Sequence, residues 1–71
     1  MKNAKDLVIG DQFTTPNSEW TIREIKKSKR EVGALFFVCD VYHYETCATV
    51  SKGLRESALP EMQFAGHESE Q

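Results

Sequence analysis

Two cysteines lie symmetrically about a histidine in the segment CDVYHYETC, residues 39–47. Thiolate and imidazole groups are ligands that zinc accepts. If a hairpin turns at His43, Cys39 and Cys47 face each other on neighbouring strands. Structural zinc motifs usually space their cysteines by about two to four residues, so Asp40, Glu45 or His67 would have to complete this site. The spacing therefore favours two free thiols, with a metal-stabilised domain and a Cys39–Cys47 disulfide as alternatives.

Catalytic patterns are not evident. The chain has no glycine-rich phosphate loop and no strand–turn–helix nucleophile motif. Cys39 and His43 share strand parity, which places them roughly 13 Å apart along an extended strand. That separation is too long for a nucleophile–base hydrogen bond. Because a domain this small rarely encloses a water-excluding pocket, we expect a protein that is not an enzyme and needs no cofactor.

One run of cations falls in a loop between two predicted strands. Its members are Lys26, Lys27, Lys29 and Arg30. With Trp20, Tyr42 and Tyr44 on the neighbouring sheet, the run could bind single-stranded nucleic acid through phosphate contacts and base stacking. Glu24 and Glu31 flank the run and weaken its field. A solvated hairpin tip that protects the sheet edge is the alternative interpretation.

The segment 34–44 has the clearest strand pattern, rich in β-branched and aromatic residues. Residues of odd number, from Leu35 to His43, form the face expected to join the core. The even face is also largely apolar, and aromatic residues are enriched at protein interfaces. We expect this outer face to bind a protein through Phe36, Val38, Tyr42 and Tyr44, with Trp20 nearby. The alternative is a cover from the C-terminal segment (Leu54, Leu59, Met62, Phe64) or from a second copy of the chain.

The remaining elements follow from turn residues and periodicity. A first strand is predicted over 7–15 with a bend at Gly10-Asp11, and a turn over 15–19 leads to a second strand over 20–27. Ile25 breaks the alternation of that strand, which indicates either a bulge near Arg23-Glu24 or a residue on the other face. A strand over 47–51 follows. Leu54, Ala58 and Met62 then recur at a helical spacing, although Pro60 limits the helix to a short turn.

Composition bounds the class of protein. The 71 residues are 39% hydrophobic and 28% charged, with a net charge of −2 and a pI of about 5.6, which indicates one globular domain. We expect a flexible arm over 1–6, the domain over 7–64 and a flexible acidic tail over 65–71. No apolar run is long enough to span a bilayer, so a cytoplasmic location is expected, and small size makes a homodimer an open option.

The chain resembles the SH3-like small β-barrels of bacteria and phages. The resemblance lies in Leu7-Val8-Ile9-Gly10-Asp11-Gln12-Phe13, followed by a turn and by Trp20-Thr21-Ile22, and it covers roughly residues 7–51. The residues after Gly53 depart from the pattern of that family. Together with the predicted strands and the short turn near Pro60, the resemblance leads us to expect a mainly β fold, either an SH3-like barrel or a curled antiparallel sheet of four to five strands with a short C-terminal helical element. The resemblance implies no function, since small barrels have many unrelated roles.

These observations lead to one functional expectation with two alternatives. We expect a non-catalytic protein-interaction module that uses the outer aromatic face. Its size and composition would suit an accessory protein of a phage or mobile element that inhibits a host protein by occupying its surface. The alternatives are a nucleic-acid-binding small barrel that uses the loop 26–30, and a metal-stabilised domain.

Overall fold

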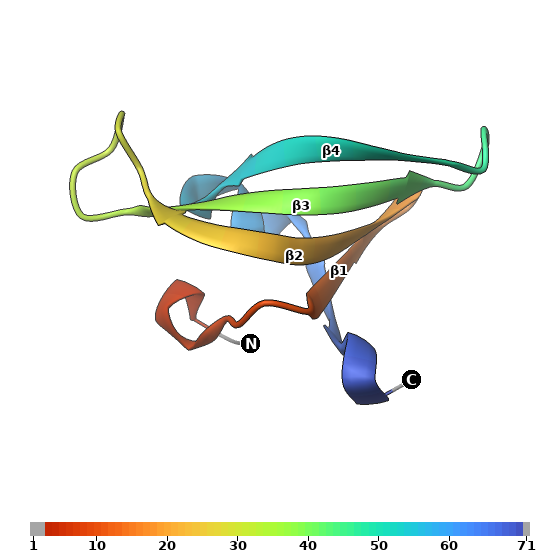
Figure 1. The fold of residues 1–71 in the computed structure, drawn as a ribbon, viewed down its shortest axis with the longest axis horizontal. Helices are drawn as coiled ribbons and strands as arrows, with labels where there is room; N and C mark the ends of the chain where they lie inside the picture. Colours follow the sequence, from red (N-terminus) through yellow and green to blue (C-terminus); the bar gives the residue numbers. More distant parts are fainter. Residues whose placement is uncertain (1–2, 71) are drawn as a thin grey trace.

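The computed structural model describes residues 3–70, which form one antiparallel sheet of five strands in the order β4-β3-β2-β1-β5 (Figure 1). Short 3-10 turns precede, connect or follow the strands. The strands are β1 (Asp11–Thr15), β2 (Ser18–Lys27), β3 (Leu35–His43), β4 (Ala48–Arg55) and β5 (Gln63–His67), and the turns are η1 (Ala4–Asp6), η2 (Glu56–Glu61) and η3 (Glu68–Glu70).

The prediction of a mainly β fold is confirmed. The sheet is curled but not closed. Within the described residues, no helix has the length and apolar character that crossing a membrane requires.

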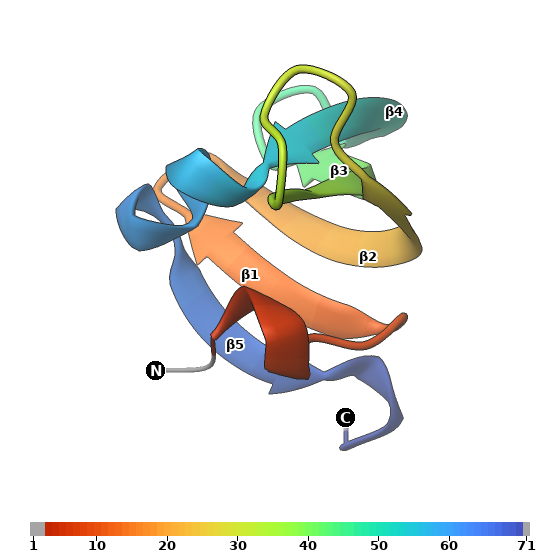
Figure 2. The same cartoon turned by 90° about the vertical axis from the view of Figure 1, so that its left-hand side faces the viewer.

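The curl of the sheet encloses the core. Figure 2 shows β1 and β5 turned beneath the layer formed by β2, β3 and β4. Eight buried side chains fill the space between; they come from β1 to β4, from the segment before β1 and from the residue between η2 and β5, and Phe64 of β5 packs against them. They are Leu7, Phe13, Ile22, Phe37, Cys39, Val41, Leu54 and Met62. The odd-numbered residues of β3 therefore face the core, as the alternation predicted.

Two irregularities predicted from the sequence are present. The register of β2 against β3 shifts between Ile22 and Glu24, so a bulge lies at Arg23. The extra residue returns Ile25 to the core side, where it lies opposite Phe37 and packs against the core. Gly10 has a φ of 97° immediately before β1, a conformation that favours glycine. The first strand therefore begins at Asp11 rather than at Leu7.

The segment after Gly53 differs from the prediction of a helical stripe. Leu54 ends up in β4 opposite Phe37, whereas Met62 follows η2 and precedes β5. Pro60 lies inside η2. Leu59 and Phe64 pack against the core cluster, so the C-terminal segment covers the inner face of the sheet. The alternative interpretation, in which this segment covers the outer face of β3, is wrong.

The two ends that the sequence predicts to be flexible make contacts with the sheet where they are described. Ala4 in η1 packs against the core, and β5 extends to His67 through pairing with β1. The Glu68 amide donates to Gly10 O at 2.9 Å, and His67 Nε2 lies 2.9 Å from Ile9 O. Residues 65–70 are thus attached to the start of β1. Residues 1–2 and 71 of the predicted arm and tail lie outside the described part.

Candidate binding surface

The outer face of β3 carries an apolar strip that the chain's own C-terminus leaves uncovered. We call Phe36, Val38, Tyr42 and Tyr44 the outer strip. The first three are half-buried, and Tyr44, just beyond β3, is 44% exposed. Figure 1 shows the β2–β3 loop and the β3–β4 turn at opposite ends of the molecule. The strip therefore runs along the long axis between these two connections.

Trp20 does not belong to this strip. It lies opposite Val41 on the core side of the sheet and packs against the core cluster. Its indole Nε1 donates a hydrogen bond to Ser18 Oγ at 2.9 Å. The sequence predicts Trp20 beside the tyrosines, but the register of β2 separates the indole from them by the thickness of the sheet.

An ion network of one guanidinium and two carboxylates interrupts the middle of the outer strip. Arg23 Nε donates to Asp40 Oδ2 at 2.9 Å, and Arg23 Nη1 donates to Glu68 Oε2 at 2.9 Å. Hydrogen bonds to Asp40 and Glu68 raise the pKa of Arg23 above its ordinary value. Because the bulge turns Arg23 to this face, the Asp40 charge between the two halves of the strip is compensated.

The tyrosine end of the strip is an aromatic cluster at the β3–β4 turn. The Tyr42 and Tyr44 rings meet edge to face with centroids 6.0 Å apart. Cys47 lies in the turn with a φ of 55°, and its Sγ lies 3.6 Å from Tyr44 O. A hydrogen bond to Cys47 raises the pKa of Tyr42. Both aromatic rings remain open to a ligand from the solvent side.

The phenylalanine end of the strip adjoins the cationic loop. Phe36 lies opposite Lys26 on β2 and opposite Arg55 on β4, so one aromatic ring has a cation on each neighbouring strand. A side chain at Gly53 would overlap the far end of the Phe36 ring. The ring therefore lies along the sheet surface over Gly53.

The loop and these strand ends enclose a groove of about 590 Å³, which we call the basic groove. Lys26, Lys27, Lys29, Arg30 and Arg55 are its cations, Glu31 is its acid, and Ser28, Phe36 and Gly53 complete the lining. The four sequence-predicted cations are thus brought together. Arg55 and Gly53 were missed, because only the β3–β4 register places them beside Phe36.

Local hydrogen bonds fix the shape of the loop that forms the basic groove. Ser28 Oγ accepts from the amides of Arg30 at 3.3 Å and Glu31 at 3.1 Å. The Ser28 amide donates to Ala34 O at 2.9 Å, and Gly33 turns the chain with a φ of 85°. The serine thus supplies the backbone partners that a short turn needs.

The cysteines do not face each other. The turn occupies residues 44–47, so His43 lies opposite Ala48 and Cys39 lies opposite Lys52. Cys39 is fully buried and Cys47 is exposed. Burial raises the pKa of the Cys39 thiol to about 11, with a smaller contribution from the Asp40 charge. A hairpin that turns at His43, the condition for pairing the two cysteines, is therefore not formed. No group of three or more metal-binding side chains occurs within residues 3–70.

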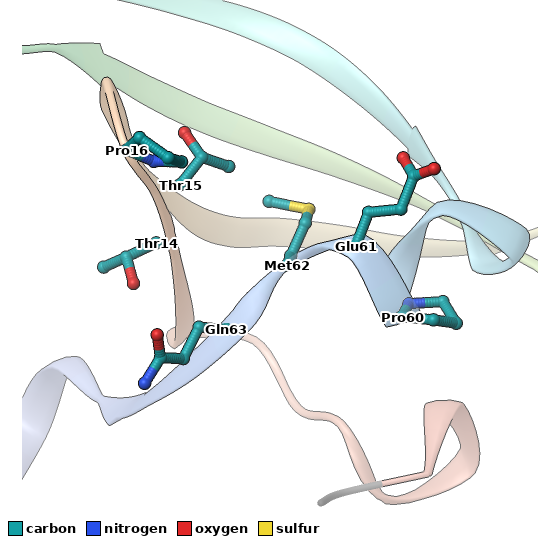
Figure 3. A pocket seen from close by; sticks show the side chains of 7 residues that line it. All are labelled: Thr14, Thr15, Pro16, Pro60, Glu61, Met62 and Gln63. Atoms are coloured by element: carbon teal, nitrogen blue, oxygen red, sulfur yellow. The ribbon is translucent and has the colours of Figure 1, made fainter.

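A second hollow, of about 450 Å³, lies between the β1–β2 turn and the segment from η2 to β5. Figure 3 shows Met62 directed toward Thr15 and Pro16 across this hollow. Its other lining residues are Thr14, Pro60, Glu61 and Gln63. It offers one carboxylate and no cation, so its chemistry is less distinctive than that of the basic groove.

Comparisons with protein families, curated proteins and solved structures find no match to this chain.

Proposed function

We propose that this chain is a non-catalytic binding module that docks a partner protein on the outer strip. One observation carries the proposal. The hydrophobic residues of the C-terminal segment pack on the inner face, so the apolar strip on the outer face has no cover from within the described chain. Tyrosine and phenylalanine are residue types that supply interface anchors at low entropic cost.

The proposal extends to the type of fold and the setting. The return of β5 to the side of β1, with a 3-10 turn between β4 and β5, supports an SH3-like barrel that has remained open. An accessory protein of a phage or mobile element, acting in the cytoplasm by occupying the surface of a host protein, suits a small domain of this kind. In this setting, the partner protein that docks on the outer strip is the host protein.

The test compares two valines of adjacent strands. Val38 belongs to the outer strip, whereas Val50 shares a face with Val41 and is 41% exposed. Candidate host complexes would be screened with the wild-type protein, and each interaction would be reconstituted with purified components. We expect Val38→Lys to abolish binding and Val50→Lys to retain it. Equal binding by both variants, or no purified partner that binds, would overturn the proposal.

Self-association is an outcome of the same test. Light scattering after size exclusion would show a mass twice that of the 8.1 kDa chain if a second copy occupies the outer strip. Val38→Lys would then restore the monomer, while Val50→Lys would leave the dimer intact. That result would mean that the outer strip binds a second copy of the chain rather than a different protein.

A further inference from the structure

The charge of this protein is segregated. Five of its nine lysine and arginine residues line the basic groove, against one of its eleven acidic residues. The groove therefore carries a formal charge of +4, whereas the rest of the chain carries −6. The net charge of −2 thus conceals a concentrated cationic site, and it is the local field that attracts an anionic ligand.

These cations are available to a ligand. Lys26 Nζ lies 3.9 Å from Glu24 Oε2, and both side chains are more than half exposed, so this contact is weak. Within residues 3–70, no ion pair engages Lys27, Lys29, Arg30 or Arg55. Arg23, by contrast, is engaged by two carboxylates. The basic groove therefore presents cations that are not neutralised by strong ion pairs within residues 3–70.

The second component of the groove is its aromatic ring. Phe36 stands in a row with Lys26 and Arg55 across three strands, and its ring lies over Gly53. Adjacent strands are about 4.8 Å apart. Lys26 and Arg55 can therefore each reach an anionic group that flanks a ligand stacked on the Phe36 ring. An aromatic surface between cations matches a base between two phosphates.

From this arrangement we propose that the basic groove binds single-stranded nucleic acid, with one base stacked on Phe36 and the flanking phosphates held by Lys26 and Arg55. Lys29 and Arg30 on the loop extend the phosphate track. The inference goes beyond the proposed protein docking, with which it shares only Phe36. A duplex would supply phosphates without an unstacked base, so the site should prefer the single strand.

The test uses a fluorescein-labelled oligothymidine of about twelve nucleotides, within the usual site size of such modules, read by fluorescence anisotropy over a range of salt concentrations. The wild-type protein should bind at low salt, and the logarithm of its binding constant should fall linearly with the logarithm of the salt concentration. A blunt duplex of equal length and polyglutamate serve as competitors. Absence of binding at low salt, or equal competition by polyglutamate, would overturn the proposal, and the latter would indicate a site for acidic protein segments.

Arg55 has a matched control on its own strand. Lys52 is exposed but belongs to the other face of β4, opposite Cys39. We expect Arg55→Gln to weaken binding and to reduce the salt slope by about 0.7, the value for one phosphate contact on a single strand. Lys52→Gln should leave the slope unchanged. Equal slopes for Arg55→Gln and the wild-type protein would remove Arg55 from the site.

Stacking is tested by two further variants. Phe36→Leu keeps an apolar side chain but loses the aromatic face, and it should weaken binding about 5- to 150-fold with the salt slope unchanged. Gly53→Ala displaces the ring while all cations remain, so it should give the same pattern. Melting curves would check folding of both. Unchanged affinity in folded Phe36→Leu would overturn base stacking. Folded Val38→Lys separates the two proposals, because it should lose the protein partner and keep the oligonucleotide.

Discussion

The two cysteines carry the same chemistry in opposite environments. Cys47 is exposed in a turn, whereas Cys39 is buried between Phe37 and Val41 on the core face of β3. Taking a thiolate out of water is unfavourable, so burial holds the Cys39 thiol in its neutral form. This difference gives the folded protein a specific response to alkaline pH.

We expect stability to fall above about pH 9 through Cys39. The pKa of its thiol is about 11 in the folded chain against an ordinary 9.0, so the folded state retains a proton that the unfolded state releases. This contribution is complete below pH 9.0 and declines as pH rises toward 11. From about pH 8 to pH 10 the loss is about 1.3 kcal/mol.

Urea unfolding of the wild-type protein and of Cys39→Ala at these pH values measures the loss. The variant is less stable at every pH, but its stability should fall less steeply. Parallel pH profiles would contradict a buried neutral thiol at position 39.

Neighbouring phenylalanines on β3 should respond differently to truncation. Phe37 is fully buried, whereas Phe36 is half-buried on the outer face. Phe37→Ala should cost about 3–5 kcal/mol because it leaves a core cavity. Phe36→Ala should cost roughly 1 kcal/mol, the size of a typical partly exposed substitution. Chemical denaturation checks both values, and comparable losses would contradict the assigned strand faces.

At the scale of elements, the ion network about Arg23 links β2, β3 and η3. Its side chains are between 39% and 45% exposed, so solvent screens the pairs. Arg23→Gln should lower the free energy of unfolding by at most about 1 kcal/mol, and the difference should shrink with added salt. Lys27→Gln, an exposed cation of the same strand, is the control. Hydrogen exchange should accelerate in β5, and a salt-independent loss would contradict the network.

Much of the sheet could be predicted because its signals are local. Alternation over 34–44 gave the two faces of β3, and the misplaced Ile25 indicated the bulge at Arg23. The spacing of Leu54, Ala58 and Met62 led to the wrong prediction of a helical stripe. The same spacing of four arises here because β4, η2 and the residue before β5 each contribute one side chain to the core. Pairing of Leu54 with Phe37 overrode the helical pattern.

The candidate site was only half predictable. The loop cations are contiguous in the sequence, so their cluster was visible. Arg55 and Gly53 lie near Phe36 only through the β3–β4 register, and the return strand predicted over 47–51 ended before both residues. Trp20 and the cysteines were misplaced because a face assignment depends on where a turn or strand begins.

At the scale of the whole molecule, charge segregation predicts behaviour that the pI of about 5.6 does not. At neutral pH and low ionic strength the protein should be retained on a cation-exchange matrix through the basic groove. The double variant Arg30→Glu with Arg55→Glu should elute without retention, while Lys52→Glu should be retained. Equal elution of all three proteins would contradict a concentrated cationic face.

The pairing of β5 with β1 has a consequence for chain connectivity. The Glu68 amide donates a hydrogen bond to Gly10 O, so the end of β5 lies beside the start of β1. A flexible linker long enough to bypass η1 could therefore join the two ends of the chain, which could then be opened elsewhere. A circular permutant opened at Val32, which is fully exposed, would keep the sheet. It would cut the β2–β3 loop, which forms one wall of the basic groove. One opened at Thr46 would keep that wall. The pair would separate the architecture of this protein from its binding surface without changing a single side chain.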